Sequence, residues 1–114
     1  MGWMADETGL GKTDANYVAL TPLSHLRRAT HVFGTRTAVI YGKHRVTYAQ
    51  YYDRCTRLAY ALAARGVSQG DVVATLIPNV PAQAEAPFGV PACGAVLNTI
   101  NTRLDVDTVT YIFA

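Results

Sequence analysis

Residues 72–77, Val-Val-Ala-Thr-Leu-Ile, are the feature that most constrains how this chain of 114 residues can fold. The run does not alternate between apolar and polar residues, so a strand formed here is mostly apolar on both faces. Such strands lie in the middle of largely parallel sheets with helices above and below. The run therefore predicts the α/β class, with a mostly parallel sheet and flanking helices.

A capped helix is predicted before this strand. Thr47 fits the N-cap position, and Gln50 follows at the spacing of a capping box. Apolar residues recur at three- and four-residue steps as far as Leu62, which gives the helix one face for burial. Gly66 suits the positive φ that ends a helix. Upstream, β-prone residues 37–41 and a turn at 42–45 predict a hairpin-like reversal.

Another helix is predicted on each side of this central stretch. Thr21 followed by Pro22 is a typical helix start, and the residues that follow give one apolar face before the chain reaches Gly34. After the strand, Asn79 is predicted to cap a helix. Pro87 and Pro91 are expected to kink or break this helix, since each removes an amide donor and clashes with the preceding turn.

The segment from Asn98 to Arg103 is the candidate ligand site of this sequence. It follows a short predicted strand at residues 95–97, and ligands of open α/β sheets bind at the carboxyl ends of the strands. An ordinary loop is the alternative, because Asn and Thr are common loop formers. A last helix, capped by Asp105, is still in apolar register at Ala114. We therefore expect the chain to be truncated at its C-terminus.

Composition excludes several partners. The net charge is +2 and the ten basic residues are scattered, so neither a nucleic-acid-binding stripe nor a polybasic membrane patch is present. No apolar run approaches the roughly 20 residues that span a bilayer. Because residues 1–17 also lack the hydrophobic segment of a signal peptide, a cytoplasmic location is predicted.

No catalytic or metal-binding set emerges from the reactive side chains. Cys55 and Cys93 are interpreted as packed, reduced thiols, because neither has a second cysteine at zinc-ligand spacing. His44 lies in the predicted turn without a carboxylate or cysteine partner. Four other basic residues are assigned to the solvated face of the first helix: His25, Arg27, Arg28 and His31.

The first 15 residues are interpreted as a flexible N-terminal arm. They contain a tempting motif, Gly9-Leu10-Gly11-Lys12-Thr13, which resembles the phosphate loop of helicase-like ATPases. In that loop the backbone amides cradle phosphates while the lysine pairs with the outer ones. Here Asp6 stands where the pattern needs glycine, and residues 14–17 are a poor helix start. A chance match in a polar arm is therefore favoured.

Several short pieces, taken in order, resemble the N-terminal part of an acyl-CoA synthetase of the AMP-forming adenylating superfamily. They are residues 20–23 (Leu-Thr-Pro-Leu), 36–42 (Arg-Thr-Ala-Val-Ile-Tyr-Gly), 47–48 (Thr-Tyr), 62–67 (Leu-Ala-Ala-Arg-Gly-Val), 70–73 (Gly-Asp-Val-Val) and 95–104 (Ala-Val-Leu-Asn-Thr-Ile-Asn-Thr-Arg-Leu). The ordered set, rather than any single piece, is specific. It covers about residues 16–113. Residues 89–104 are similar to the branch that activates medium- and long-chain or aromatic acids.

The resemblance implies a two-step reaction in the full-length enzyme. A carboxylic acid, ATP and magnesium give an acyl-adenylate, and coenzyme A then displaces AMP to form a thioester. The family's phosphate loop, magnesium-binding glutamate and catalytic lysine lie downstream of the matching region. No catalytic, cofactor-binding or metal-binding residue therefore carries over to this chain. Residues 16–114 are expected to be an incomplete piece of the large N-terminal domain, inactive alone, whose partner is the remainder of the synthetase.

Two other hypotheses stay open at this point. One is a stand-alone or vestigial binding module that packs on a partner. The other is the start of a phosphate-loop nucleotide hydrolase at Gly9 to Thr13. If the chain is instead a synthetase fragment, an apolar face or sheet edge stays exposed, since later elements would cover it. We then expect marginal stability, self-association, and the least protection from Asp105 onward.

Overall fold

Threonine caps set where the first two long helices begin. The computed structural model describes Gly9 and residues 11–114. Helix α1 (Pro22–Phe33) is capped by Thr21, and α2 (Tyr48–Ala63) by Thr47, whose hydroxyl accepts a hydrogen bond from the amide of Gln50. In both helices the third residue returns a bond to the cap amide, which completes a capping box. The predicted starts of both helices are confirmed.

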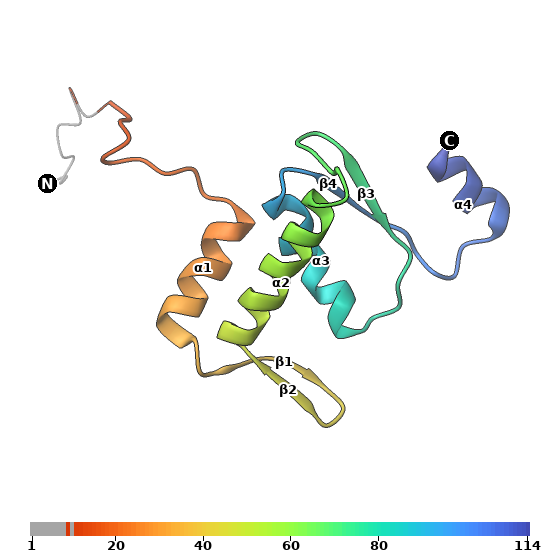
Figure 1. Cartoon of the computed structure of the whole chain (residues 1–114), viewed down its shortest axis with the longest axis horizontal. Coiled ribbons are helices and arrows are strands. Elements are labelled where there is room, and N and C mark those ends of the chain that lie inside the picture. Colours follow the sequence, from red (N-terminus) through yellow and green to blue (C-terminus); the bar gives the residue numbers. More distant parts are fainter. Residues whose placement is uncertain (1–8, 10) are drawn as a thin grey trace, which may run out of the picture.

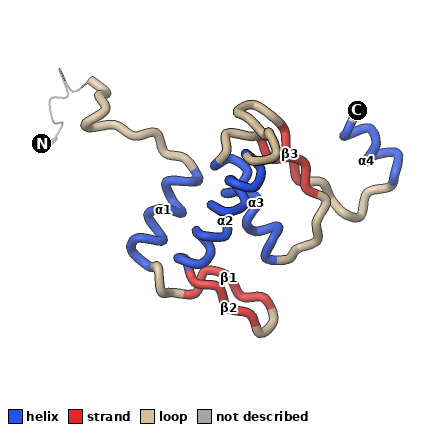
Figure 2. Tube along the Cα trace, viewed as in Figure 1, coloured by secondary structure: helices blue, strands red, loops and turns tan. Residues whose placement is uncertain are grey.

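The predicted hairpin lies between these helices. Strand β1 (Thr37–Tyr41) pairs antiparallel with β2 (His44–Thr47), and the turn contains only Gly42 and Lys43. The predicted turn of four residues is therefore too long, because His44 pairs with Tyr41 across the ladder. The hairpin forms a separate two-stranded sheet and lies below the first turn of α2 (Figure 2).

A parallel strand pair confirms the α/β class. Strand β3 (Val72–Thr75) pairs in parallel with β4 (Val96–Thr99), and helix α3 (Pro81–Ala92) connects them. Both strands differ from their predicted bounds. β3 ends at Thr75, two residues early, and β4 takes in Asn98 and Thr99, which were assigned to the following segment. Within the described part of the chain β3 pairs only with β4, so it lies at an edge and not in the middle of a sheet.

Helix α3 was predicted to be kinked or broken, and it is not broken. It runs without interruption through Pro87 and Pro91, and its N-cap is Val80, not Asn79, with no side-chain hydrogen bond. A proline inside a helix costs about 3 kcal/mol. Packing offsets that cost here, because α3 buries residues along its length and contacts α1, α2, β3 and β4. The exposed position of Pro87 leaves the packed face of α3 intact.

Helix α2 lies in the middle of the core, between α1 and α3 (Figure 1). One cluster of buried side chains joins all three helices through Leu26, Tyr51 and Cys55, with Phe88 packed against it. A second cluster, around Ala86 and Val90, joins α3 to the parallel strands. The phenyl ring of Phe88 meets the ring of Tyr51 edge-on, with centroids 5.7 Å apart.

A glycine sets how closely α2 and α3 approach. A Cβ atom added at Gly89 would lie 2.6 Å from Cδ2 and 2.9 Å from Cβ of Leu58. These distances are shorter than any ordinary carbon contact, so no larger residue fits without a shift of one helix. The α2–α3 contact therefore depends on the missing side chain at position 89.

Helix α4 (Val106–Phe113) stands apart from this core (Figure 1). As predicted, Asp105 caps it: the carboxylate accepts a hydrogen bond from the amide of Thr108, which lowers the pKa of Asp105. None of its residues is buried. Several of its apolar side chains are largely exposed, including Tyr111 at 82% and Phe113 at 61%.

We expect Gly89→Ala to lower the free energy of unfolding by about 1–3 kcal/mol, because the added methyl group overlaps Leu58. This is the opposite sign to the usual effect of alanine, which favours a helix over glycine by about 1 kcal/mol. Urea unfolding followed by circular dichroism measures the change. Gly11→Ala is the control, since nothing lies within 4 Å of its added Cβ.

A double mutant tests the cause of this effect. Leu58→Ala removes the atoms that the new methyl group would meet, so the two substitutions together should cost less than the sum of their separate costs. Strict additivity would mean that Gly89→Ala acts through something other than the α2–α3 contact.

Burial raises the pKa of the Cys55 thiol to about 11, so little of the reactive thiolate exists at neutral pH. Cys93 is only partly buried. Iodoacetamide should therefore modify Cys93 first in the native chain and reach Cys55 only when urea unfolds it. Mass spectrometry of the two cysteine peptides measures both rates. Equal native rates would contradict the buried position of Cys55.

Amide hydrogen exchange should be fast throughout α4 and slowest in the middle of α2, because local opening of α4 exposes no buried contact. The measurement compares peptides from α4 with peptides around Tyr51 and Cys55, at a protein concentration where the chain is monomeric. Similar protection of α4 and α2 would show that α4 packs on the core in solution.

Candidate functional site

A polar hollow of about 740 Å³ lies at the carboxyl ends of the two parallel strands. Three segments form it: the turn after β3, the first turn of α3, and the chain that leaves β4. The lining residues are Ile77, Pro78, Asn79, Gln83, Thr99, Ile100, Asn101, Thr102 and Arg103. The hollow therefore lies at the sheet edge where ligands of open α/β sheets bind.

Hydrogen bonds donated by backbone amides hold both walls of the hollow. The amide of Ile100 donates to the carbonyl of Thr75 over 2.8 Å, and the Ile100 side chain is buried, so the chain leaves β4 along a fixed path. The Asn101 side chain then accepts a bond from the amide of Arg103 at 3.0 Å. On the other wall the amide of Val80 donates to the carbonyl of Pro78. These hydrogen bonds thus fix the backbone that carries the polar side chains of the hollow.

The predicted candidate segment is largely brought to this hollow. Thr99, Asn101, Thr102 and Arg103 line it, together with the buried Ile100. Asn98 lies inside β4, opposite Ala74 of β3, and does not line it. That these residues bind a ligand stays a prediction. The sequence predicted Asn79 as a helix cap and did not single out Gln83, which lies inside α3. The proximity of the two parallel strand ends was the signal that points to Asn79, because the residues after β3 share that edge.

Two buried oxygen atoms near this edge have no hydrogen-bond partner among the described residues. They are Oγ1 of Thr75, at the end of β3, and Oε1 of Gln83. Leaving such an atom unpaired costs about 1–3 kcal/mol. The terminal torsion of a glutamine side chain is broad, so the carboxamide of Gln83 can rotate toward a donor in the hollow. Gln83 is therefore a position at which an incoming donor group gains a hydrogen bond.

The side chains of the hollow suit recognition more than catalysis. Arg103 is the one charged residue in its lining, which contains no carboxylate, histidine or cysteine. General acid–base catalysis needs a titratable group near the substrate. Among residues 9 and 11–114, no group of three His, Cys, Asp or Glu residues could hold a metal ion. The hollow can offer amide and hydroxyl hydrogen bonds and one positive charge.

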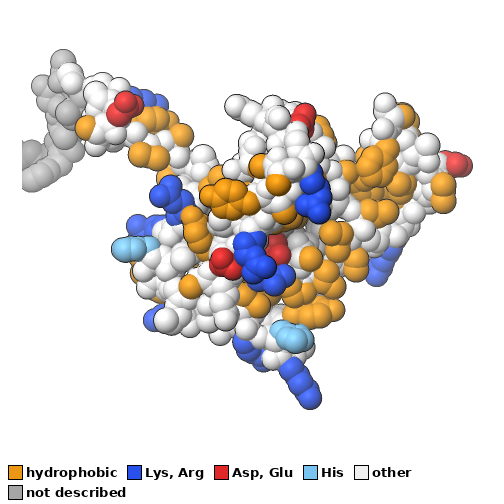
Figure 3. Space-filling view, viewed as in Figure 1, with side chains coloured by type: hydrophobic (Ala, Val, Ile, Leu, Met, Phe, Trp, Pro, Cys, Tyr) orange, Lys and Arg blue, Asp and Glu red, His pale blue; other side chains and the backbone are white. Residues whose placement is uncertain are grey.

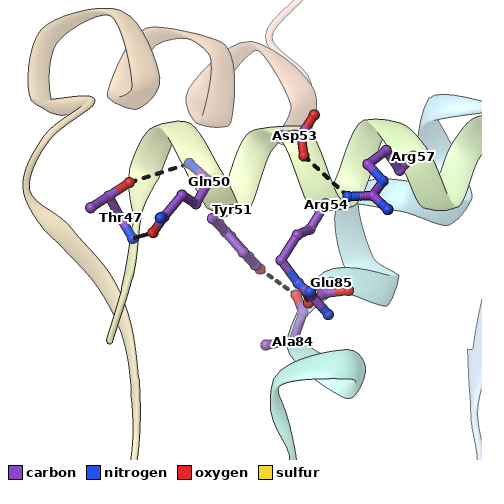
Figure 4. Close-up of polar contacts among 8 residues, drawn as sticks. All are labelled: Thr47, Gln50, Tyr51, Asp53, Arg54, Arg57, Ala84 and Glu85. Atoms are coloured by element: carbon purple, nitrogen blue, oxygen red, sulfur yellow. Dashed lines mark hydrogen bonds and ion pairs between the residues drawn. The ribbon is translucent and has the colours of Figure 1, made fainter. Parts of the chain in front are cut away.

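A second polar cluster lies on the α2–α3 contact (Figure 4). The hydroxyl of Tyr51 donates to the carbonyl of Ala84, and Nε of Arg54 donates to Oε1 of the buried Glu85. Burial, followed by the charges of Cys55 and Glu85, raises the pKa of Tyr51 to about 12. The hydrogen bond from Arg54 to Glu85 raises the pKa of the guanidinium. This cluster joins two helices and is not part of the hollow.

The other reactive residues lie apart from the hollow. His25, Arg27, Arg28 and His31 are exposed on α1, as predicted for a solvated face. His44 is exposed in β2 and takes no part in the ion pairs of the described residues. Both cysteines are free, with Cys55 buried and Cys93 partly buried, as predicted for packed thiols.

The Gly-Lys-Thr sequence of the N-terminal arm is not followed directly by a helix. Residues 14–16 form a turn, in which Asn16 accepts a hydrogen bond from the amide of Thr13, and Nζ of Lys12 lies 4.3 Å from the centre of the Tyr17 ring. A phosphate loop requires a helix that starts at this lysine. Residues 1–8 and Leu10, which include most of the predicted arm and the strand position before the loop, lie outside the described residues.

In the part of the chain that the structure describes, every helix is too short or too polar to span a lipid bilayer.

Known proteins resemble this chain in sequence. Residues 26–114 match the family described as AMP-binding enzyme. A peroxisomal acetate/butyrate–CoA ligase of Arabidopsis thaliana is 52% identical over 109 residues, which are 96% of this chain and 19% of that protein. A peroxisomal trans-cinnamate:CoA ligase of Petunia hybrida is 54% identical over 84% of this chain and 17% of its own length. The chain thus spans about a fifth of the length of these relatives.

Solved structures resemble its fold. A fatty acyl CoA synthetase of Mycobacterium tuberculosis matches 77% of this chain and 18% of its own, with 36% identity and a TM-score of 0.74. The N-terminal subdomain of NpsA from Klebsiella oxytoca matches 81% of this chain and 24% of its own, with 22% identity and a TM-score of 0.77. The fold is therefore part of that subdomain's fold. Since one family matches most of the sequence and relatives are half identical to it, the chain belongs to the AMP-binding enzyme family.

Proposed function

We propose that this chain is the N-terminal scaffold portion of an ATP-dependent, AMP-forming carboxylic acid–CoA ligase. The identity of 52% across nearly the whole chain with an acetate/butyrate–CoA ligase carries the proposal. Residues 16–114 are then part of the AMP-binding domain, and residues 1–15 precede it as an arm. The partner of the chain is the rest of the synthetase.

The proposed substrate class is a carboxylic acid of the fatty or aromatic type. Relatives at 50–54% identity are named for acetate, butyrate, benzoate and trans-cinnamate. These acids share the carboxylate and differ in the group attached to it. The sequence of this region therefore supports the shared carboxylate chemistry without favouring one acid.

The described residues contribute support and positioning, not chemistry. In the proposed ligase, ATP converts the carboxylate into an acyl-adenylate with release of pyrophosphate, and coenzyme A then displaces AMP. Neither the polar hollow nor the α2–α3 cluster fits a magnesium ion, since no three metal-binding side chains meet among the described residues. ATP, magnesium and coenzyme A are thus assigned to the remainder of the enzyme. The chain holds the parallel strand pair and its polar edge in place.

The cellular location stays a prediction. A cytoplasmic location was expected from the sequence, whereas several relatives are named as peroxisomal. Fluorescence microscopy of the full-length protein with a tag at either end distinguishes the two.

A chimeric enzyme tests the proposed function. Residues 16–114 would replace the matching region of the Arabidopsis acetate/butyrate–CoA ligase, and a coupled assay would measure pyrophosphate release with acetate, butyrate, benzoate and cinnamate. We expect acid-dependent release by the chimera, because its catalytic groups lie in the retained part. The 114-residue chain alone should release none.

The intact Arabidopsis ligase is the positive control, and the chimera without acid is the blank. Two results would contradict the proposal. One is turnover by the isolated chain that survives further purification. The other is a chimera that folds, with Cys55 protected from iodoacetamide, but releases no pyrophosphate with any of the acids.

A further inference from the structure

A second hollow continues the polar one across the start of α3. It has a volume of about 310 Å³ and is lined by residues from β1 and from the first turn of α3: Val39, Ile40, Tyr41, Asn79, Val80, Pro81, Gln83 and Ala84. Asn79 and Gln83 line both hollows. The two hollows therefore adjoin at these residues, and together they extend from the hairpin to the ends of β3 and β4. We call the two adjoining hollows the hairpin groove.

The chemistry changes along the hairpin groove. Its hairpin end is apolar, and the large side chains there are poorly covered, with Ile40 at 64% exposed and Tyr41 at 47%. Hydrophobic side chains gather on the face between the hairpin and the parallel strands (Figure 3). In the middle, Oε1 of Gln83 accepts no hydrogen bond from the part of the chain that the structure describes. At the far end Arg103 supplies the one positive charge of the lining.

We propose that the hairpin groove is a docking site for a segment of the synthetase that lies outside these 114 residues. The segment carries an apolar side chain for the hairpin end, an N–H or O–H donor for Oε1 of Gln83, and a carboxylate opposite Arg103. This inference rests on the proposed function, because it takes the partner to be the rest of the same enzyme.

Three observations favour this occupant. The chain spans about a fifth of its relatives, so most of each relative's length is available to cover exposed apolar surface. Apolar surface that is gathered in one place usually marks an interface. The lining has no acidic residue, so an acidic segment meets no repulsion from it.

A second copy of the chain fits the groove less well. In a twofold dimer the same surface patch meets itself. The hairpin groove of one copy would then have to supply the carboxylate that faces Arg103 of the other copy, and its lining contains no carboxylate. The occupant is therefore complementary to the groove and not identical with it.

Labelling of introduced thiols tests the proposal. Ile40→Cys places a thiol in the groove, and Val32→Cys places the control on α1, at a residue that is 53% exposed and lines neither hollow. Each substitution is made in the isolated chain and in the chimera described above. Iodoacetamide labelling of each peptide, measured by mass spectrometry, gives the rates.

In the isolated chain at low concentration, both introduced thiols should react at similar rates. In the chimera without acid or ATP, the thiol at position 40 should react at least about tenfold more slowly, as expected for a side chain buried at the centre of an interface. The thiol at position 32 should keep its rate. Protection of Cys55 in the same samples shows that both proteins are folded.

A glutamine pair gives a second measurement that needs no new thiol. Gln83→Leu keeps the size of the side chain but removes the acceptor, and Gln69→Leu is the matched exposed control. In the chimera Gln83→Leu should speed the labelling of Cys55 or lower the melting temperature more than Gln69→Leu does. In the isolated chain no donor fills the groove, so Gln83→Leu should not speed the labelling of Cys55 or lower the melting temperature more than Gln69→Leu does.

Three results would overturn the inference. Equal labelling at position 40 in the chimera and the isolated chain would mean that the groove stays open. Protection that appears only after butyrate or cinnamate is added would assign the groove to a small acid. Protection that grows with the concentration of the isolated chain would assign it to a second copy. Pyrophosphate release is measured separately, so a protected groove in an inactive chimera counts against the proposed function alone.

Discussion

The close approach of α3 to α2 is the contact on which the rest of this structure depends. Gly89 permits it, because the backbone of α3 lies where Leu58 leaves no room for a side chain. Two further contacts act at the same place: the edge-on rings of Tyr51 and Phe88, and the pairing of Arg54 with the buried Glu85. An ion pair of this kind adds little net stability but is costly to break on one side, so it favours one register of the helices over others.

The position of α3 then determines which side chains line the polar hollow at the ends of β3 and β4. Parallel strands need a crossover connection, and α3 is the crossover between β3 and β4. Only residues 76–80 separate the end of β3 from α3, and in the packed structure Asn79 and Gln83 lie beside the chain that leaves β4. The hollow at this edge is thus a consequence of the strand pairing and of the helix that links the strands.

Sequence reasoning succeeded where a few neighbouring residues decide the outcome. The caps at Thr21, Thr47 and Asp105 each depend on a residue within three positions, and all three were predicted. At α3, local rules predict a kink or a break at Pro87 and Pro91, and the break does not occur. The helix continues because tertiary packing outweighs the cost of the prolines, and residues from four other elements supply that packing.

The candidate site, too, could be predicted where local sequence decides and not where tertiary packing decides. Thr99 to Arg103 could be placed at the sheet edge from one predicted strand and a rule about strand ends. Gln83 could not, since its role depends on the rotation of α3 about its own axis. That helix has almost no preferred apolar side in its sequence, because alanine and proline occur all around it. Only the packed structure shows which side of α3 faces the hollow.

The apolar run of residues 72–77 predicts a strand that is covered on both faces, and these 114 residues do not supply all of that cover. A strand apolar on both faces suits the middle of a covered sheet. Yet Val72 is 64% exposed and Val96, opposite it on β4, is 56% exposed, while α4 covers neither. The pattern therefore fits a larger sheet, in which further strands and helices pack on β3 and β4. An enzyme about five times the length of this chain, as its relatives are, would supply them.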